Sequence, residues 1–153
     1  MRVSRVIAAC TLVLLVMALP APASAKRVHT AATGSMIGAI NQVRAEHGLR
    51  ALRASSSLNG SSSRFSSSLL RRGVLAHRSR VSASGHFSRL GEALAMHGGR
   101  GLGVGSVVRM WLRSPTHRAV ILTRSMNLVG VGASQGRFHG RRATIWVLQA
   151  GRR

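Results

Sequence analysis

The side chains that could perform acid–base or metal chemistry are few in this sequence of 153 residues. Glu46 and Glu92 are its only carboxylates, its histidines number 7, and its one cysteine is Cys10. This supply excludes sites that need several carboxylates, namely paired-carboxylate glycosidases, two-metal centres and EF-hand calcium loops. The sequence also lacks the H-E-x-x-H zinc motif. Any acid–base or metal site must therefore consist of histidines and at most two glutamates.

Basic side chains dominate the charge. Lysine and arginine together number 23, and the formal net charge is +21. Such a protein is expected to adsorb to anionic cell-wall polymers, to lipid head groups or, without sequence specificity, to nucleic acid. Specific DNA recognition is not expected, because no helix-turn-helix, zinc-finger or RNA-binding signature is present. The simplest interpretation of most arginines is a solvated basic surface, with clusters at Arg64, Arg71, Arg72, Arg78 and Arg80 and at Arg137, Arg141 and Arg142.

The N-terminus has the pattern of a signal peptide over residues 1–25. Arg2 and Arg5 precede the apolar run from Val6 to Leu19, and Ala23-Ser24-Ala25 supplies small residues for cleavage after Ala25. An uncleaved anchor is the alternative. Cleavage would remove Cys10 and leave a secreted, extracellular or cell-wall-associated protein that starts at Lys26 and contains no disulfide. Residues 26–35 are small and polar, and we expect them to be a flexible leader.

Helical patterns occupy much of the remaining chain. Apolar residues recur at helical spacing from Met36 to His47, and Gly48 fits a helix C-cap. Val104–Leu112 has one apolar face, and Pro115 suits the first turn of a further helix with Ser114 as its N-cap. Ser55–Ser68 is ambiguous: its pattern is weakly helical, but its serine content is equally typical of a low-complexity linker.

The end of the chain changes to strand-like patterns. Leu128–Ala133 and Ala143–Ala150 are rich in valine, isoleucine and tryptophan, and Gln135–Arg142 between them is expected to be a hairpin loop. Arg80–Gly85 and the glycine-rich Gly98–Gly105 are expected to be loops as well. Helices followed by strands predict an α+β domain with a small antiparallel sheet.

Several phrases together resemble one family. They occur in the order Asn41–Leu49, Arg72–His77, Gly91–Ala95, Trp111–Arg118 and Val129–Gly132. In this order they resemble the CAP superfamily, which comprises the cysteine-rich secretory, antigen 5 and pathogenesis-related 1 proteins, and in particular its bacterial, secreted, SCP-like branch. The resemblance extends over residues 36–151. It implies an α-β-α sandwich with a cleft that, in many members, holds two histidines, two acids and a divalent metal such as zinc.

The resemblance assigns residues to that cleft. His77 and His117 correspond to the two histidines and would be the zinc ligands, and Glu92 corresponds to one of the acids. The chain departs from the family pattern because Ala93 replaces the usual asparagine, the second acid has no counterpart, and the last strand, Ile145–Gln149, lacks the familiar Thr-Gln pair. These departures weaken a catalytic interpretation more than they weaken the fold.

We predict that His77, Glu92 and His117 converge in one cleft. Gly91 would allow a tight turn before Glu92, and Arg118 would line the cleft and compete with the histidines for the Glu92 carboxylate. The plainer alternative is that both histidines only bond polar groups and that Glu92 ties loops together. The other histidines (His29, His47, His86, His97 and His139) are expected to be exposed or to cap helices, whereas Trp111, Trp146, Asn41 and Arg44 are expected to support the core.

Three functions remain open at this point. The first is a monomeric, non-enzymatic protein that binds an anionic envelope component or a small apolar ligand. The second is a zinc-dependent hydrolase with His77 and His117 as ligands and Glu92 as base, because two imidazoles and a carboxylate are ordinary zinc partners. The third is a cationic protein that coats the cell wall or nucleic acid.

Overall fold

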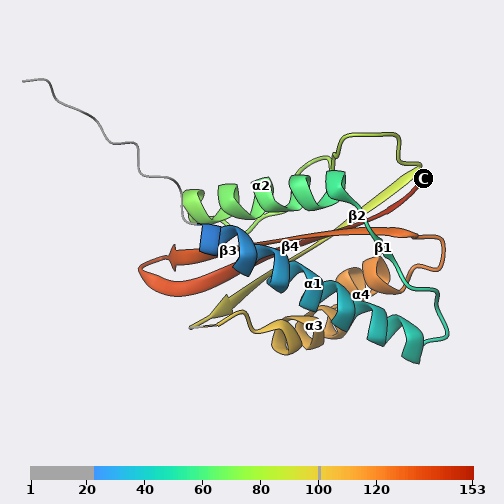
Figure 1. Cartoon of the computed structure of the whole chain (residues 1–153), viewed down its shortest axis with the longest axis horizontal. Coiled ribbons are helices and arrows are strands. Elements are labelled where there is room, and N and C mark those ends of the chain that lie inside the picture. Colours follow the sequence, from blue (N-terminus) through green and yellow to red (C-terminus); the bar gives the residue numbers. More distant parts are fainter. Residues whose placement is uncertain (1–22, 100) are drawn as a thin grey trace, which may run out of the picture.

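The computed structural model describes residues 23–99 and 101–153. A four-stranded sheet with the strand order β1-β3-β4-β2 lies between two helical layers (Figure 1). The prediction of an α+β sandwich with the sheet between helices is confirmed. Most of the predicted signal peptide, residues 1–22, lies outside the described residues. Within the described ranges, no helix combines the length and apolar character needed to span a bilayer.

The central part of the sheet is a long hairpin. Strand β3 (Leu128–Phe138) pairs antiparallel with β4 (Arg141–Arg152), and the turn is only His139–Gly140. Both turn residues have positive φ, 48° and 77°, as a tight two-residue hairpin turn requires. The expected loop over Gln135–Arg142 is therefore wrong, because most of its residues continue the two strands as paired partners.

Two further strands complete the sheet. Strand β2 (Arg89–Gly98) pairs antiparallel with β4, and the two-residue strand β1 (Arg53–Ala54) pairs parallel with β3. The sheet is thus mixed, and neither strand was predicted. Gly91 lies inside β2 at a position where an added Cβ would contact Val120 at 3.1 Å, so its role is close packing and the expected tight turn is wrong.

Helix α2 (Ser56–Arg72) covers one face of the sheet. Gly130 and Gly132 of β3 lie directly under it, since a Cβ on either glycine would overlap the α2 backbone at Leu58 or Ser62. Ser62 donates to the Gly130 carbonyl at 3.3 Å, and the Ser66 and Ser134 hydroxyls are 2.9 Å apart. The serine-rich segment is a helix and no linker, because small side chains allow this close contact.

Helices α1 (Ala23–Glu46), α3 (Val104–Arg113) and α4 (Pro115–Leu122) cover the opposite face. Alternation along β4 shows the two faces, since Trp146 and Leu148 pack with this helical layer, whereas Ile145 and Val147 pack beneath α2. The larger core lies on the three-helix side. Trp111 and Trp146 are both fully buried there, as predicted.

Helix α1 begins earlier than the sequence pattern indicates. Residues 26–35, expected to be a flexible leader, are helical, and Ala32 is 1% exposed in the larger core. The polar composition gave no sign of this helix, because a single small residue per turn is enough to contact the core. Further along α1, Asn41 and Arg44 support buried backbone as predicted. Asn41 donates to the Leu52 carbonyl and accepts from the Leu52 amide, at 3.0 and 2.8 Å.

Candidate functional site

Glu92 is a buried carboxylate near the start of the edge strand β2. Its side chain is 2% exposed, and its cross-strand partner on β4 is Gln149. The amide Nε2 of Gln149 donates to Glu92 Oε2 at 3.1 Å. A charged group at this depth requires such partners, because desolvation of an unpaired carboxylate is costly.

His77 supplies the second partner of that carboxylate. It follows the C-terminus of α2, where Gly73 caps the helix in the left-handed conformation with a φ of 62°. The Nδ1 of His77 donates to Glu92 Oε1 at 3.1 Å, while about half of the His77 side chain, 52%, remains exposed. The bond to Glu92 fixes the ring orientation and leaves Nε2 as the atom available to a ligand or solvent.

His117 completes the group from α4, two residues after Pro115 in the first turn. The centroids of the His77 and His117 rings are 5.7 Å apart, and their planes are inclined at 44°. Burial lowers the pKa of His117 below 6.5, and the neighbouring His77 lowers it further. His77 therefore lies beside both Glu92 and His117 at the β2 edge of the sheet, whereas a cleft shared by all three stays a prediction.

Arg118 does not lie where the sequence analysis placed it. Its Nη2 is 3.2 Å from Nε2 of His47, just after the end of α1, and its side chain lines a separate hollow on α4. The Glu92 carboxylate instead lies 3.1 Å from Nδ1 of His77 and 3.8 Å from Nε of Arg78. The expected Arg118–Glu92 pair is wrong. Consecutive residues of an α-helix point in different directions, so Arg118 does not share the side of α4 on which His117 approaches His77.

Arg78 and Gln149 are site residues that sequence reasoning missed. The Nε of Arg78 is 3.8 Å from Glu92 Oε2, and its guanidinium lies 3.9 Å from the centre of the Phe65 ring. Two signals were available in the sequence. Arg78 directly follows His77, and Gln149 is the one amide in an otherwise apolar run of β4.

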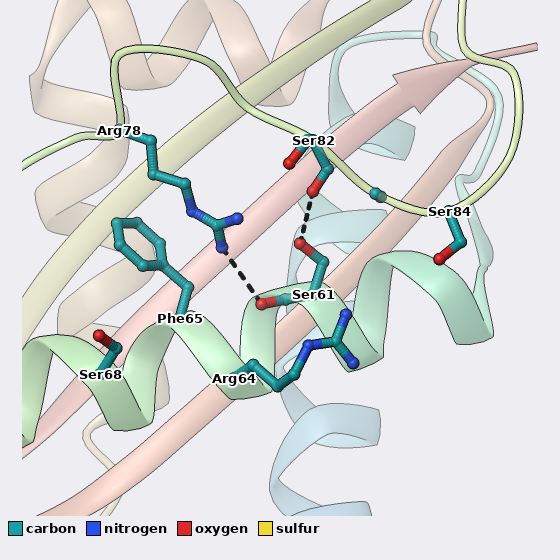
Figure 2. Close-up of a pocket in the computed structure, with 8 residues that line it drawn as sticks. Ser61, Arg64, Phe65, Ser68, Arg78, Ser82 and Ser84 are labelled. Atoms are coloured by element: carbon teal, nitrogen blue, oxygen red, sulfur yellow. Dashed lines mark hydrogen bonds between the residues drawn. The ribbon is translucent and has the colours of Figure 1, made fainter.

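A groove adjoins this group on the α2 side (Figure 2). It has a volume of about 600 Å³ and lies between α2 and the segment that follows Arg78. Arg78 donates to the Ser61 carbonyl at 3.3 Å, and the Ser61 hydroxyl donates to the Ser82 carbonyl at 2.7 Å, so the two walls are tied together. Arginine and serine side chains give the groove a cationic, hydrogen-bonding character.

The donor set does not fit a catalytic zinc centre. Such centres ordinarily have three protein ligands and one open position. Across residues 23–99 and 101–153, no three side chains of histidine, cysteine, aspartate or glutamate are grouped to hold a metal ion. Both oxygens of Glu92 already accept hydrogen bonds. Zinc binding by the two imidazoles of His77 and His117 stays a prediction.

The sequence also contains a serine motif that, in other settings, marks a catalytic nucleophile. Gly132-Ala133-Ser134-Gln135-Gly136 has the form G-x-S-x-G, which marks a nucleophile only where the serine lies on a sharp turn between a strand and a helix. Here Ser134 lies within β3, is 6% exposed, and shares hydrogen bonds with the hydroxyls of Ser66 and Ser67. The motif therefore serves the contact between α2 and the sheet.

The sequence model of CAP, the cysteine-rich secretory protein family, matches residues 37–150. The chain belongs to the CAP family. An extracellular SCP-domain protein from Bacillus anthracis has a similar structure, with a TM-score of 0.69 and 16% identity over 90% of this chain. The present CAP chain spans only 45% of that longer chain.

Two other solved structures are similar along most of their own length. An outer surface protein from Borrelia burgdorferi gives a TM-score of 0.62 with 20% identity, covering 78% of this CAP chain and 91% of the other. Venom allergen-like protein 4 from Schistosoma mansoni gives 0.64 with 11% identity, covering 79% and 88%. No curated protein matches the chain significantly in sequence. These structural similarities show a shared fold and leave the ligand to be inferred from the site.

Proposed function

We propose that this CAP protein is a secreted, non-enzymatic protein that binds an anionic component of the cell envelope. Support for secretion comes from the signal-peptide pattern and from similarity to CAP proteins described as extracellular or outer-surface proteins. The ligand class follows from the charge distribution. The observation that supports an anionic ligand is the difference in exposure between the two glutamate side chains.

Glu92 is buried and paired, so it contributes little to the outer surface. Glu46, at the end of α1, is then the only exposed carboxylate side chain in a sequence with 23 basic residues. Across the described residues, Arg78 is the one arginine within 4.0 Å of a carboxylate. The exposed arginines therefore attract external anions without competition from neighbouring acids.

The geometry of Glu92 favours binding over hydrolysis. A general base must reach the proton that it removes, directly or through one water. Glu92 is 2% exposed and has both oxygens engaged by His77 and Gln149, so its carboxylate is poorly placed to act on a substrate from solvent. The arginines and serines that line the groove of Figure 2 favour a charged ligand over a small apolar one.

Co-sedimentation with poly(glycerol phosphate) and with anionic lipid vesicles tests the proposal. Binding should fall steeply as salt rises, because exposed charges are screened over about 8 Å at physiological ionic strength. Retention at about 1 M salt, well beyond that screening regime, would overturn a charge-driven contact. Duplex DNA as a competitor tests the third function, a cationic coating protein. If DNA displaces the protein equally from the polymer and from the vesicles, its binding is unselective and driven by charge alone.

The hydrolase alternative has its own test in metal analysis of the purified protein. One zinc per chain that disappears in the His77→Ala/His117→Ala variant would support a metal centre and contradict the non-enzymatic proposal if ester or peptide hydrolysis disappears with it. Absence of stoichiometric zinc after incubation with the metal would remove the hydrolase from consideration.

A further inference from the structure

Another hollow, separate from the groove of Figure 2, is bordered by four arginines. Its volume is about 520 Å³, within the range of roughly 300–1,000 Å³ that small-molecule sites occupy. The arginines come from separate segments that meet at the right-hand end of Figure 1: the α1–β1 connection, β1, the α4–β3 connection and the end of β4. They are Arg50, Arg53, Arg124 and Arg152.

The four guanidinium groups have no anionic partner in the described part of the chain. None of them lies within 4.0 Å of a carboxylate there, because Arg78 is the only arginine with such a contact. Like charges gathered around one hollow repel each other, and this repulsion weakens when an anion enters. The remaining polar lining, Ser125 and Asn127, adds hydrogen-bonding groups and no opposing charge.

The backbone that carries these arginines is held in place by the buried residue Arg44. Its side chain donates from Nε to the Arg50 carbonyl at 2.9 Å and from Nη1 to the carbonyls of Ile121 and Thr123. Arg44 is 0% exposed, and burial lowers the pKa of its guanidinium. One buried side chain thus links the connection that bears Arg50 to the connection that bears Arg124.

Other hydrogen bonds fix the remaining two arginines. The Arg53 amide donates to the Asn127 carbonyl, and the Asn127 amide donates to the Gly151 carbonyl, both at 3.0 Å. The Arg152 carbonyl accepts from the Ser88 amide at 2.9 Å. The backbone around the hollow is therefore held in place, and the ordering that opposes ligand binding is that of the exposed arginine side chains.

We propose that this hollow binds a group with two or more adjacent phosphates. Guanidinium groups present forked donors that match phosphate oxygens in paired hydrogen bonds. Several positive charges around one compact volume favour a ligand with several negative charges over a single carboxylate. The inference rests on the proposed function, since it names the chemical group that one part of the basic surface selects. The molecule that carries these phosphates is either a soluble pyrophosphate or an envelope polymer with a phosphodiester chain.

Calorimetric titration of the purified protein with inorganic pyrophosphate tests the site at physiological salt. The variant Arg50→Gln/Arg124→Gln should lose at least about tenfold in affinity, equivalent to about 1.4 kcal/mol. The matched control is Arg109→Gln/Arg113→Gln, which removes the same charge from exposed positions on α3 outside the hollow. This control should change the affinity by less than about twofold, as expected for distant charges that salt screens.

Two further arms distinguish the sources. Orthophosphate should bind more weakly than pyrophosphate, and poly(glycerol phosphate) should compete with pyrophosphate only if a polymer chain enters the same hollow. Equal losses in the two variants, or no pyrophosphate binding by the wild type, would overturn the site. Equal losses would leave the proposed envelope binding intact, whereas salt-independent co-sedimentation would overturn that function without deciding this site.

Discussion

The Nδ1 atom of His77 lies 3.1 Å from Oε1 of Glu92, although the two positions are 15 residues apart in the chain. The pair joins the segment after α2 to the edge strand β2. Because the imidazole is half exposed and the carboxylate is almost fully buried, the bond holds a surface side chain on an internal anchor. Gln149 on β4 holds the other oxygen of the same carboxylate.

Replacement of that anchor should destabilise the fold. In Glu92→Ala the buried amide of Gln149 loses its acceptor, and its other polar atom, Oε1, already has no partner within the described residues. Leaving a buried polar group unpaired costs about 1–3 kcal/mol, and we expect a loss of that size in the free energy of unfolding. Urea denaturation measures it.

The control for this experiment is Glu46→Ala. Glu46 is exposed and accepts only a weak, 3.4 Å hydrogen bond from Gln42, so the change should stay within about 0.5 kcal/mol. Equal stability losses for the two glutamates would show that the network around Glu92 contributes nothing particular to folding.

The titration of His117 should report its neighbours. Burial is the larger cause and His77 the smaller cause of its lowered pKa. In His77→Gln the pKa of His117 should therefore rise but remain below 6.5. An NMR titration of the His117 ring protons measures both midpoints, and a wild-type midpoint above 6.5 would contradict the arrangement.

The sign of the linked stability effect follows from that lowered pKa. Between the folded pKa of His117 and 6.5, the unfolded chain binds the proton more readily than the folded chain. The contribution of His117 to stability is thus fully present above 6.5 and is lost as the pH falls through this window. His117→Gln should reduce the slope of melting temperature against pH in that window.

The contact between α2 and β3 predicts a sharp difference between two glycines. Gly130→Ala should destabilise the protein by at least about 1–3 kcal/mol, the usual cost of inserting atoms into a packed contact. Gly38→Ala is the control, because Gly38 lies inside α1 with nothing within 4 Å of an added Cβ. This control should gain up to about 1 kcal/mol from helix propensity. Thermal denaturation that ranks the two variants in the opposite order would refute the contact.

The mature N-terminus is expected to be Lys26. The Ala23-Ser24-Ala25 site provides the small residues that signal peptidase accepts, and cleavage there would leave most of α1, Ala23–Glu46, on the exported protein. Mass spectrometry of the protein from its native host measures this end directly. An intact Met1 on that protein would contradict the export prediction.

The predictable part of this molecule was the part with strong local patterns. Helices α3 and α4 match their expected ranges closely, because apolar periodicity and Pro115 mark them. The proximity of His77 to Glu92 and His117 could be predicted only through the CAP resemblance. No periodic pattern brings together residues from a loop, a strand and a helix.

The parts that were wrong, missed or left open depend on contacts between distant segments. Arg89–Gly98 has alanine and glycine at positions that become a strand only because β4 pairs with it along its whole length. Ser56–Arg72 has poor helix propensity and becomes a helix against the glycines of β3. The Arg78–Phe65 contact and the choice of Arg78 over Arg118 depend on side-chain directions that spacing alone does not specify.

The position of β4 in the sheet governs when this protein can fold during its synthesis. β4 is the last element of the chain, yet it lies between β3 and β2 and supplies hydrogen bonds to both. A ribosome-bound chain that ends before Arg141 therefore lacks the strand that joins β3 to β2, and the serine-rich helix lacks part of its packing surface. Closure of the domain therefore requires Arg141–Arg152 to be synthesised, although every other strand and helix of the described structure precedes them in the sequence.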